Sequence, residues 1–215
     1  MASTRFSDQE LQRIREAVRT AEERISGEIV PVFVETSGHY TIANYRGAVI
    51  GIGLFFVSLI VFDRFFPELA LYDPVLILLL VSVGGMLGAI LPQWVPGLKR
   101  LLVTRAQCDH AARSRAERIF LEQEVFNTRH RTGIMLFVSF FEHEVIVMAD
   151  RGISKVVDQA EWDNVVAMIT RRIPQGQVID GMNEAIQRCS EILLEKGFAR
   201  TANDVNELRD DLRVE

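Results

Sequence analysis

The longest apolar stretch of the chain contains two charge-free segments separated by a short charged loop. The segments are GAVIGIGLFFVSLIVF at residues 47–62 and PVLILLLVSVGGMLGAIL at residues 74–91. A helix rises about 1.5 Å per residue, so about 20 residues cross a hydrocarbon core of about 30 Å. With their flanking residues, both segments reach this length. The pattern predicts a transmembrane helical hairpin over residues 40–96; the alternative is an apolar hairpin buried inside a soluble protein.

Charges around the hairpin predict its orientation. Basic residues flank the two segments, whereas the loop between them is acidic. The basic residues are Arg46, Lys99, Arg100 and Arg105, and the acidic ones are Asp63, Glu68 and Asp73. Lys and Arg accumulate on the cytoplasmic side of membrane proteins. We therefore expect a two-pass protein of the cell (inner) membrane, with both termini and the soluble part in the cytoplasm.

Glycines give each predicted membrane helix a face of small side chains. Gly47 and Gly51 are four residues apart, as are Gly84 and Gly88. Such spacing allows helix backbones to approach closely. These faces pack on each other or on a partner, so the lipid bilayer and either a membrane protein or a second copy of the chain are the expected partners.

The remaining sequence alternates helical and strand patterns. Ser7 and Glu10 form a capping box, and apolar residues follow at helical spacing. Two later apolar runs flank the short turn FEHE, which predicts a β-hairpin. The predicted helices are residues 7–25, 104–127, 158–172 and 176–196, and the predicted strands are residues 28–35, 133–141 and 145–149.

This order predicts one α/β domain that the membrane hairpin interrupts. Residues 1–36 form its first part, residues 104–200 its second part, and residues 201–215 a polar tail. We expect a three-layer α/β/α sandwich with a small mixed sheet. Pro31 in the first strand lacks an amide proton, which indicates a bulge or an edge position.

Composition and cysteine spacing narrow the function classes. The net charge is −5, so there is no general electrostatic attraction to nucleic acid, and we expect no nucleic-acid partner. Cys108 and Cys189 lie in helical patterns without the spacing of a zinc or redox site. Known nucleophile elbows, phosphate loops and zinc-protease motifs are also absent from the sequence.

Several strings, taken in order, resemble the TPM domain family. They are SDQELQRIREAVRTAEERISGEIVPVFVE, TRHRTGIMLFVSFFEHEVIVMADRGI, WDNVVAMITRRI and DVNEL. The likeness is to a bacterial branch in which membrane helices interrupt the domain after its first strand; other relatives are thylakoid lumen and photosystem II repair proteins. The resemblance implies an α/β/α fold, membrane association and, for some relatives, calcium binding or weak acid phosphatase activity.

Sheet topology predicts where a site would form. If the first two strands are parallel, as a crossover connection favours, Glu28 and Thr132 lie at one end of the sheet, and the hairpin returns Asp150 to that end. Glu28, Asp150 and Thr132 are candidate ligands for calcium or magnesium. Arg131 and Arg151 are candidates for ion pairing or for binding a phosphate. A purely structural ion-pair cluster is the alternative.

Three functions fit these features. The first is a membrane-anchored interaction or assembly module with a cytosolic α/β domain and a divalent cation as a candidate ligand. The second is a weak metal-dependent acid phosphatase, for which no catalytic residue is identified. Transport ranks last, because the two apolar segments carry no charge that would mark a pathway.

Overall fold

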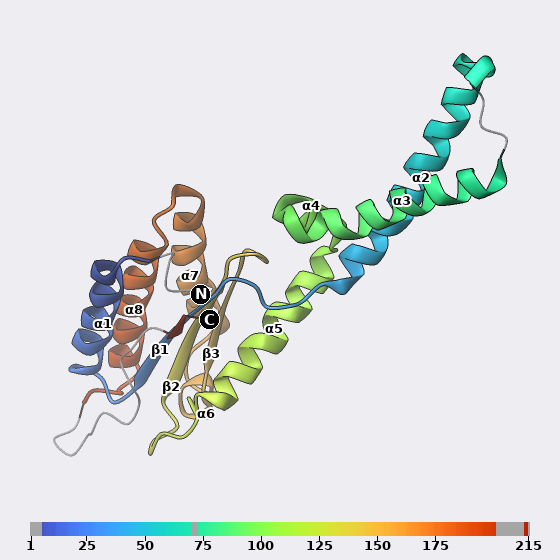
Figure 1. The fold of residues 1–215 in the computed structure, drawn as a ribbon. Coiled ribbons are helices and arrows are strands. Elements are labelled where there is room, and N and C mark those ends of the chain that lie inside the picture. Colours follow the sequence, from blue (N-terminus) through green and yellow to red (C-terminus); the bar gives the residue numbers. More distant parts are fainter. Residues whose placement is uncertain (1–5, 70–72, 201–212, 215) are drawn as a thin grey trace. The chain divides into compact units, whose positions relative to one another are not determined.

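The computed structural model describes residues 6–69, 73–200 and 213–214. The predicted polar tail therefore lies outside the described residues, except for its short segment Arg213–Val214. The chain forms two compact units, Met1–Ser37 with Asp109–Glu215 and Gly38–Cys108 (Figure 1). The first unit is the α/β domain, and the second holds the two long apolar helices.

The α/β domain contains a small mixed sheet and its covering helices. Its strands are β1 (Glu28–Val34), β2 (Gly133–Ser139), β3 (Glu144–Ala149) and β4 (Arg213–Val214). Its helices are α1 (Asp8–Glu22), α5 (Arg105–Glu122, in this unit from Asp109 onward), α6 (Arg151–Ser154), α7 (Gln159–Arg172) and α8 (Val178–Glu195), with a 3₁₀ turn at Ile173–Gln175.

The strands follow the order β3-β2-β1-β4. β1 pairs with β2 in parallel, from Glu28 opposite Gly133 to Val34 opposite Ser139, which confirms the predicted crossover. β2 and β3 form the predicted antiparallel hairpin. Pro31 causes no bulge, because the register with β2 continues through it. On its other side β1 pairs with β4 only at Val32 and Phe33, so Pro31 need not donate to that neighbour.

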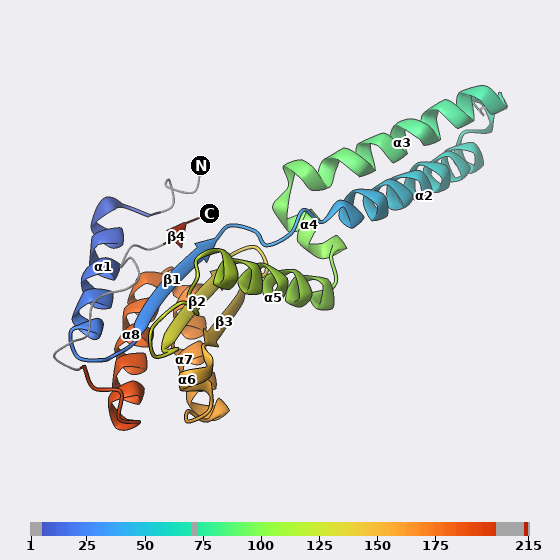
Figure 2. The ribbon, with the colours of Figure 1, turned by 90° about the horizontal axis from the view of Figure 1, so that it is seen from below.

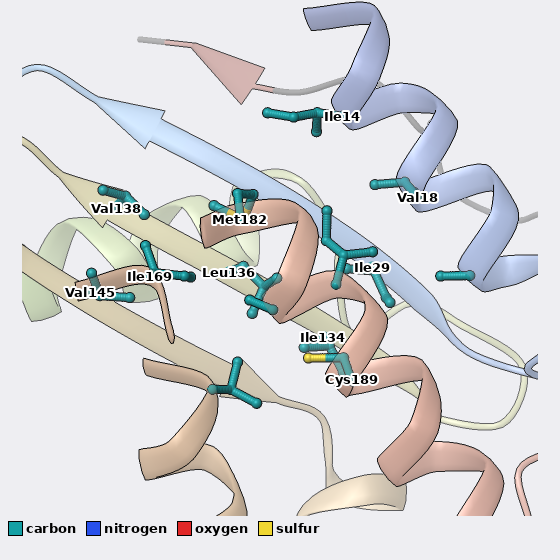
Figure 3. Packing of buried hydrophobic residues seen from close by; sticks show 14 of the residues in the cluster. Ile14, Val18, Ile29, Ile134, Leu136, Val138, Val145, Ile169, Met182 and Cys189 are labelled. Atoms are coloured by element: carbon teal, nitrogen blue, oxygen red, sulfur yellow. The ribbon is translucent and has the colours of Figure 1, made fainter. Parts of the chain in front are cut away.

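Two apolar clusters cover the two faces of the sheet. The larger joins α1, α7 and α8 to alternate residues of the strands, and Figure 3 shows Ile29, Leu136 and Met182 at its centre. The smaller joins the intervening strand residues to α5 through Ala112, Ala116 and Ile119. Both faces of the strands are covered, which explains why the strand sequences are uninterrupted hydrophobic runs.

Helix α5 ends five residues earlier than the sequence pattern suggests. Glu124 adopts a left-handed conformation, with φ 51°. The amide of Val125 then donates to the carbonyl of Phe120 at 3.1 Å, which closes the helix in a Schellman motif. Phe126 therefore belongs to the following loop.

The second unit contains α2 (Thr41–Phe65), a 3₁₀ turn (Pro67–Leu69), α3 (Pro74–Trp94) and α4 (Pro96–Leu102). Both α2 and α3 are long and apolar enough to cross a membrane. Most of their large apolar side chains, including Leu54, Phe56 and Leu78, are exposed in the chain by itself. This is the pattern of helices whose outer surface faces an apolar environment.

Helix α4 was not predicted. Pro96 is its first residue, where a missing amide proton costs nothing. Arg46 of α2 donates from Nη1 to the carbonyl of Leu102 at 2.6 Å, so one of the predicted flanking cations binds the C-terminal end of α4. Lys99 lies 5.7 Å from the centre of the Tyr40 ring. Two of the flanking basic residues thus make specific contacts within this unit.

The glycine faces pack against each other. A Cβ atom added to Gly51 would clash with the carbonyl of Gly84 and lie 3.2 Å from Cα of Gly88. Gly47 and Gly88 meet in the same way, each against the other's carbonyl. Of the two alternatives that the spacing left open, the structure thus shows packing within the hairpin.

This packing generates a prediction with a matched control. Gly51→Val should destabilise the hairpin by about 1–3 kcal/mol or more, because the new side chain must push the two backbones apart. Gly53→Val on the same helix meets nothing within 4 Å and should change stability little. Thermal unfolding in detergent, followed by tryptophan fluorescence, checks both variants. Equal melting temperatures for the two would contradict the observed helix contact.

Candidate functional site

The two predicted carboxylates come to the same end of the sheet. Glu28 begins β1 opposite Gly133, and the amide of Asp150 donates to the carbonyl of Gly133 at 2.9 Å. Both side chains are mostly buried, at 8% and 6% exposure. The parallel pairing and the returning hairpin therefore bring Glu28 and Asp150 close to one residue, Gly133.

Strand alternation sets which face each side chain takes. Glu28 is in phase with Val30 and Val32, and Asp150 with Ile146 and Met148, all of which belong to the cluster covered by α5. Thr132 is in phase with Ile134, which faces the opposite layer. The pleat thus separates the Thr132 side chain from the two carboxylates, although its carbonyl accepts from the amide of Glu28 at 3.2 Å.

Asp150 has one oxygen in use and one that lacks a hydrogen bond. It is the N-cap of α6, and its Oδ1 accepts from the amide of Arg151 at 2.7 Å. Its Oδ2 is buried without a hydrogen-bond partner, 3.8 Å from Nη1 of Arg131. Burying a carboxylate oxygen is costly unless an opposite charge lies close. The nearby guanidinium supplies part of that compensation.

Arg131 is held by the loop before β2. Its Nη1 donates to the carbonyl of Phe126 at 3.0 Å, and its guanidinium lies 5.6 Å from the centre of the Phe126 ring. Its backbone is left-handed, with φ 56°, and its carbonyl accepts from the amide of Gly152 at 2.9 Å. Arg151, by contrast, is exposed at the start of α6.

Two glycines allow this loop to pack closely. A Cβ at Gly152 would lie 2.7 Å from the carbonyl oxygen of His130, and one at Gly133 would clash with the carbonyl oxygen of Val125. Neither position can hold a Cβ unless the backbone shifts. The RTG and ADRGI strings thus have a local physical role: Gly133 allows Val125 to approach the start of β2, and Gly152 allows α6 to approach the loop at His130 and Arg131.

A third buried carboxylate lies at the opposite end of the sheet. Glu142, in the β2–β3 turn, is 4% exposed. It accepts from the amide of Ser37 at 2.8 Å, from the hydroxyl of Thr36 at 3.4 Å and from the hydroxyl of Ser139. Ser37 and Ser139 also share a hydrogen bond of 2.8 Å. These contacts tie the turn to the residues that follow β1, at the boundary with the second unit.

Sequence reasoning missed the Glu142 cluster. The FEHE string indicates an exposed turn, yet its first carboxylate is buried. The sequence did hold a signal for this cluster. The parallel register places Ser139 opposite Val34, and Thr36 and Ser37 come just after Glu35, which ends this segment. Three hydroxyl residues at one strand end favour a buried acceptor there.

The described residues contain neither a cluster arranged to bind a metal ion nor, at Cys189, a reactive thiol. Within residues 6–69, 73–200 and 213–214, no group of three or more His, Cys, Asp or Glu side chains is arranged to hold a metal ion. The thiol of Cys189 lies in the larger core cluster, and burial raises its pKa to about 12. It is therefore protonated, and not a nucleophile, at neutral pH.

The geometry defines a class: a mixed α/β domain with buried carboxylates at both sheet ends, carrying an inserted hairpin of two apolar helices. Comparison with protein-family models gave no match. Comparison with curated proteins likewise gave none. Among solved structures, the chain is similar to the NMR structure of the BA42 protein from the psychrophilic bacterium Bizionia argentinensis, with a TM-score of 0.59 and 17% identity over 98% of this chain and 95% of that one. This likeness concerns the fold alone.

The Glu142 cluster generates a stability prediction. Glu142→Gln replaces an acceptor with an amide that turns one N–H group towards other donors, so it should cost about 1–3 kcal/mol. Glu117→Gln, on the exposed side of α5, is the matched control and should change stability by less than about 0.5 kcal/mol. Urea unfolding of the two variants measures the difference. Equal midpoints would show that the Glu142 contacts contribute nothing.

Proposed function

We propose that this protein is a membrane-anchored, TPM-like interaction or assembly module. In this proposal α2 and α3 cross the bacterial inner membrane, and both termini and the α/β domain lie in the cytoplasm. The charge pattern supports this orientation. Basic residues lie near the start of α2 and just after the end of α3, whereas Asp63, Glu68 and Asp73 lie at the connection between the two helices.

The observation that carries the proposal is that the hairpin keeps an exposed apolar surface after its two helices have packed together. The glycine faces are used in the contact between α2 and α3, whereas long apolar side chains such as Ile50, Phe56 and Leu79 remain exposed. Lipid covers such a surface, and a helix of another membrane protein can replace part of that lipid. The apolar side chains that α2 and α3 do not use to contact each other are available for this second contact.

The fold contributes a second element of the proposal, a three-layer α/β/α arrangement. It is supported by the two apolar clusters, one between the sheet and α1, α7 and α8, the other between the sheet and α5. Figure 2 shows the helices of the larger cluster together beside the strands. Within this unit, the Glu142 cluster joins the β2–β3 turn to Thr36 and Ser37, the residues that follow β1.

Purification from native membranes tests the assembly proposal. The tagged full-length protein in mild detergent should retain a stoichiometric membrane protein, identified by mass spectrometry against a strain lacking the gene. A Cβ at Gly53 meets nothing within 4 Å, so Gly53→Trp enlarges an open position of α2, and loss of the partner would locate the contact on the outer surface of the hairpin.

A protein that emerges alone would contradict the assembly proposal. The topology is checked in the same membranes with a membrane-impermeant maleimide, which labels a cysteine placed at Glu68 or at Ser7 in a variant whose own Cys108 and Cys189 are replaced by alanine. Labelling of position 68 from outside and of position 7 only after lysis is expected, and the reverse would contradict the proposed orientation.

Cation binding is a second candidate function, favoured by Asp150 Oδ2. This buried oxygen has no hydrogen bond and shares a sheet end with Glu28. The adjacent Arg131 opposes a cation, because its positive charge lies 3.8 Å from the same oxygen. The two carboxylates would hold the ion only if Arg131 turned away, with water and backbone carbonyls completing the oxygen ligands.

The Asp150→Asn variant distinguishes cation binding by Asp150 from an ion pair with Arg131 alone. Calcium should raise the melting temperature of the wild type but not of Asp150→Asn, which keeps the cap acceptor and loses the charge. Asp158→Asn, at the N-terminus of α7, is the control and should respond to calcium like the wild type. Identical responses of all three proteins would remove Asp150 from the cation model. Phosphoester hydrolysis that disappears in Asp150→Asn would support the phosphatase alternative instead.

A further inference from the structure

Exposed apolar side chains continue from the two long helices onto the short helix α4. Trp94, the last residue of α3, and Leu101 of α4 are each 81% exposed, and Tyr45 of α2 is 70% exposed. Figures 1 and 2 show α4 at the end of the hairpin where α2 begins. The apolar surface of this unit therefore reaches beyond the ends of the two segments that are long enough to cross a membrane.

Helix α4 is amphipathic. Leu98, Leu101 and Leu102 follow the i, i+3, i+4 spacing of one helix face, and Lys99 and Arg100 lie outside that face. The helix packs against α2 and α3. Leu98 and Leu102 are half-buried, whereas Leu101 stays uncovered. Such a division is typical of a helix in the interface of a bilayer, with its apolar side chains towards the acyl chains and its cations towards the headgroups.

Hydrogen bonds hold α4 in position. Arg46 of α2 donates to the carbonyl of Leu102 at 2.6 Å and to Oε1 of Gln107 at 3.4 Å. The same Oε1 accepts from the amide of Thr104 at 3.1 Å. The C-terminal end of α4 is thus tied to α2, so a fixed helix presents Leu101 to its surroundings.

The aromatic side chains lie at the level where the uncharged segments end. A Cβ added to Gly47, the first residue of the uncharged segment of α2, would lie 3.1 Å from Cγ of Pro92 in α3. Tyr45 and Arg46 come just before Gly47, and Trp94 comes just after Pro92. Trp and Tyr are enriched at the level of the lipid headgroups. This level of the hairpin therefore matches a membrane interface.

Every Lys, Arg, Asp or Glu at this end of the hairpin is a cation. Residues 38–50 and 88–108 contain no Asp or Glu, and their basic residues are Arg46, Lys99, Arg100 and Arg105. Arg100 and Arg105 have exposed side chains. The acidic residues of this unit lie instead at the connection between α2 and α3. Basic clusters beside an apolar segment are complementary to an anionic lipid surface.

We propose that this end of the hairpin selectively binds anionic phospholipid. Trp94 and Leu101 contact the acyl chains, and Arg100 and Arg105 bind the headgroup phosphates, which a guanidinium matches in geometry and charge. A neutral helix of another protein would cover the apolar side chains but would leave the cations without a counter-charge. The inference rests on the proposed function, in which α2 and α3 cross the membrane, and adds the class of lipid at one end of them.

Quenching of tryptophan fluorescence by brominated lipid tests this proposal. The full-length protein is placed in vesicles of phosphatidylcholine and phosphatidylglycerol in equal amounts, with bromine on the acyl chains of one lipid or of the other. Brominated phosphatidylglycerol should quench Trp94 about twofold more strongly, because it gathers beside the cations. Trp162 is 7% exposed in the core of the α/β domain, so Trp94→Phe should lose the lipid-dependent signal. Equal quenching by the two lipids would overturn the proposal.

Variants and salt test the role of the cations. Arg100→Gln and Arg105→Gln should each lower the preference for brominated phosphatidylglycerol, and the double variant should abolish it. Arg64→Gln, an exposed arginine at the other end of α2, is the matched control and should keep the preference. High salt should weaken the preference of the unsubstituted protein, because it screens exposed charges. A preference that neither salt nor the double variant changes would overturn the assignment to these arginines.

A second tryptophan position separates this inference from membrane crossing itself. Phe56 of α2 is 51% exposed and lies within the uncharged segment. Phe56→Trp, introduced together with Trp94→Phe, should be quenched equally by the two brominated lipids. Quenching at position 56 but not at Trp94 would show that protein covers this end, and would overturn the lipid inference alone. No quenching at either position would overturn the proposed membrane crossing as well.

Discussion

The parallel pairing of β1 with β2 is the contact on which the rest of the α/β domain depends. It joins Glu28–Val34 to Gly133–Ser139, two segments that the whole hairpin unit separates in sequence. Its register sets both sheet ends at once: Glu28 comes beside Gly133 and hence Asp150, and Val34 comes beside Ser139 and hence Glu142. A shift by one residue would exchange the faces of every side chain in β1 and would dissolve both clusters.

Much of this architecture is predictable from local pattern. The capping box of α1, the apolar runs of the strands and the apolar length of α2 and α3 each depend on neighbouring residues only, and the structure contains all of them. The convergence of Glu28 and Asp150 also follows, because a crossover connection favours parallel first strands and the β-hairpin then returns the chain to the same sheet end. The glycine spacing predicts close helix contact, though not which helix is the partner.

The features that were missed depend on distant residues or on the phase of the pleat. Glu142 is buried because Ser37, far away in sequence, brings its amide to it. Thr132 is separated from Glu28 by the phase of the pleat, which chain order does not reveal.

The position of the insertion has a consequence for how the protein is made. β1 leaves the ribosome before α2 and α3, and its partner β2 follows only after them. A strand cannot gain the free energy of pairing until its neighbour exists, here about 100 residues later, and contacts of such long range form slowly. During synthesis β1 must therefore remain unpaired until the hairpin has been completed. The two apolar helices are thus synthesised in full before the domain into which they are inserted can complete its sheet.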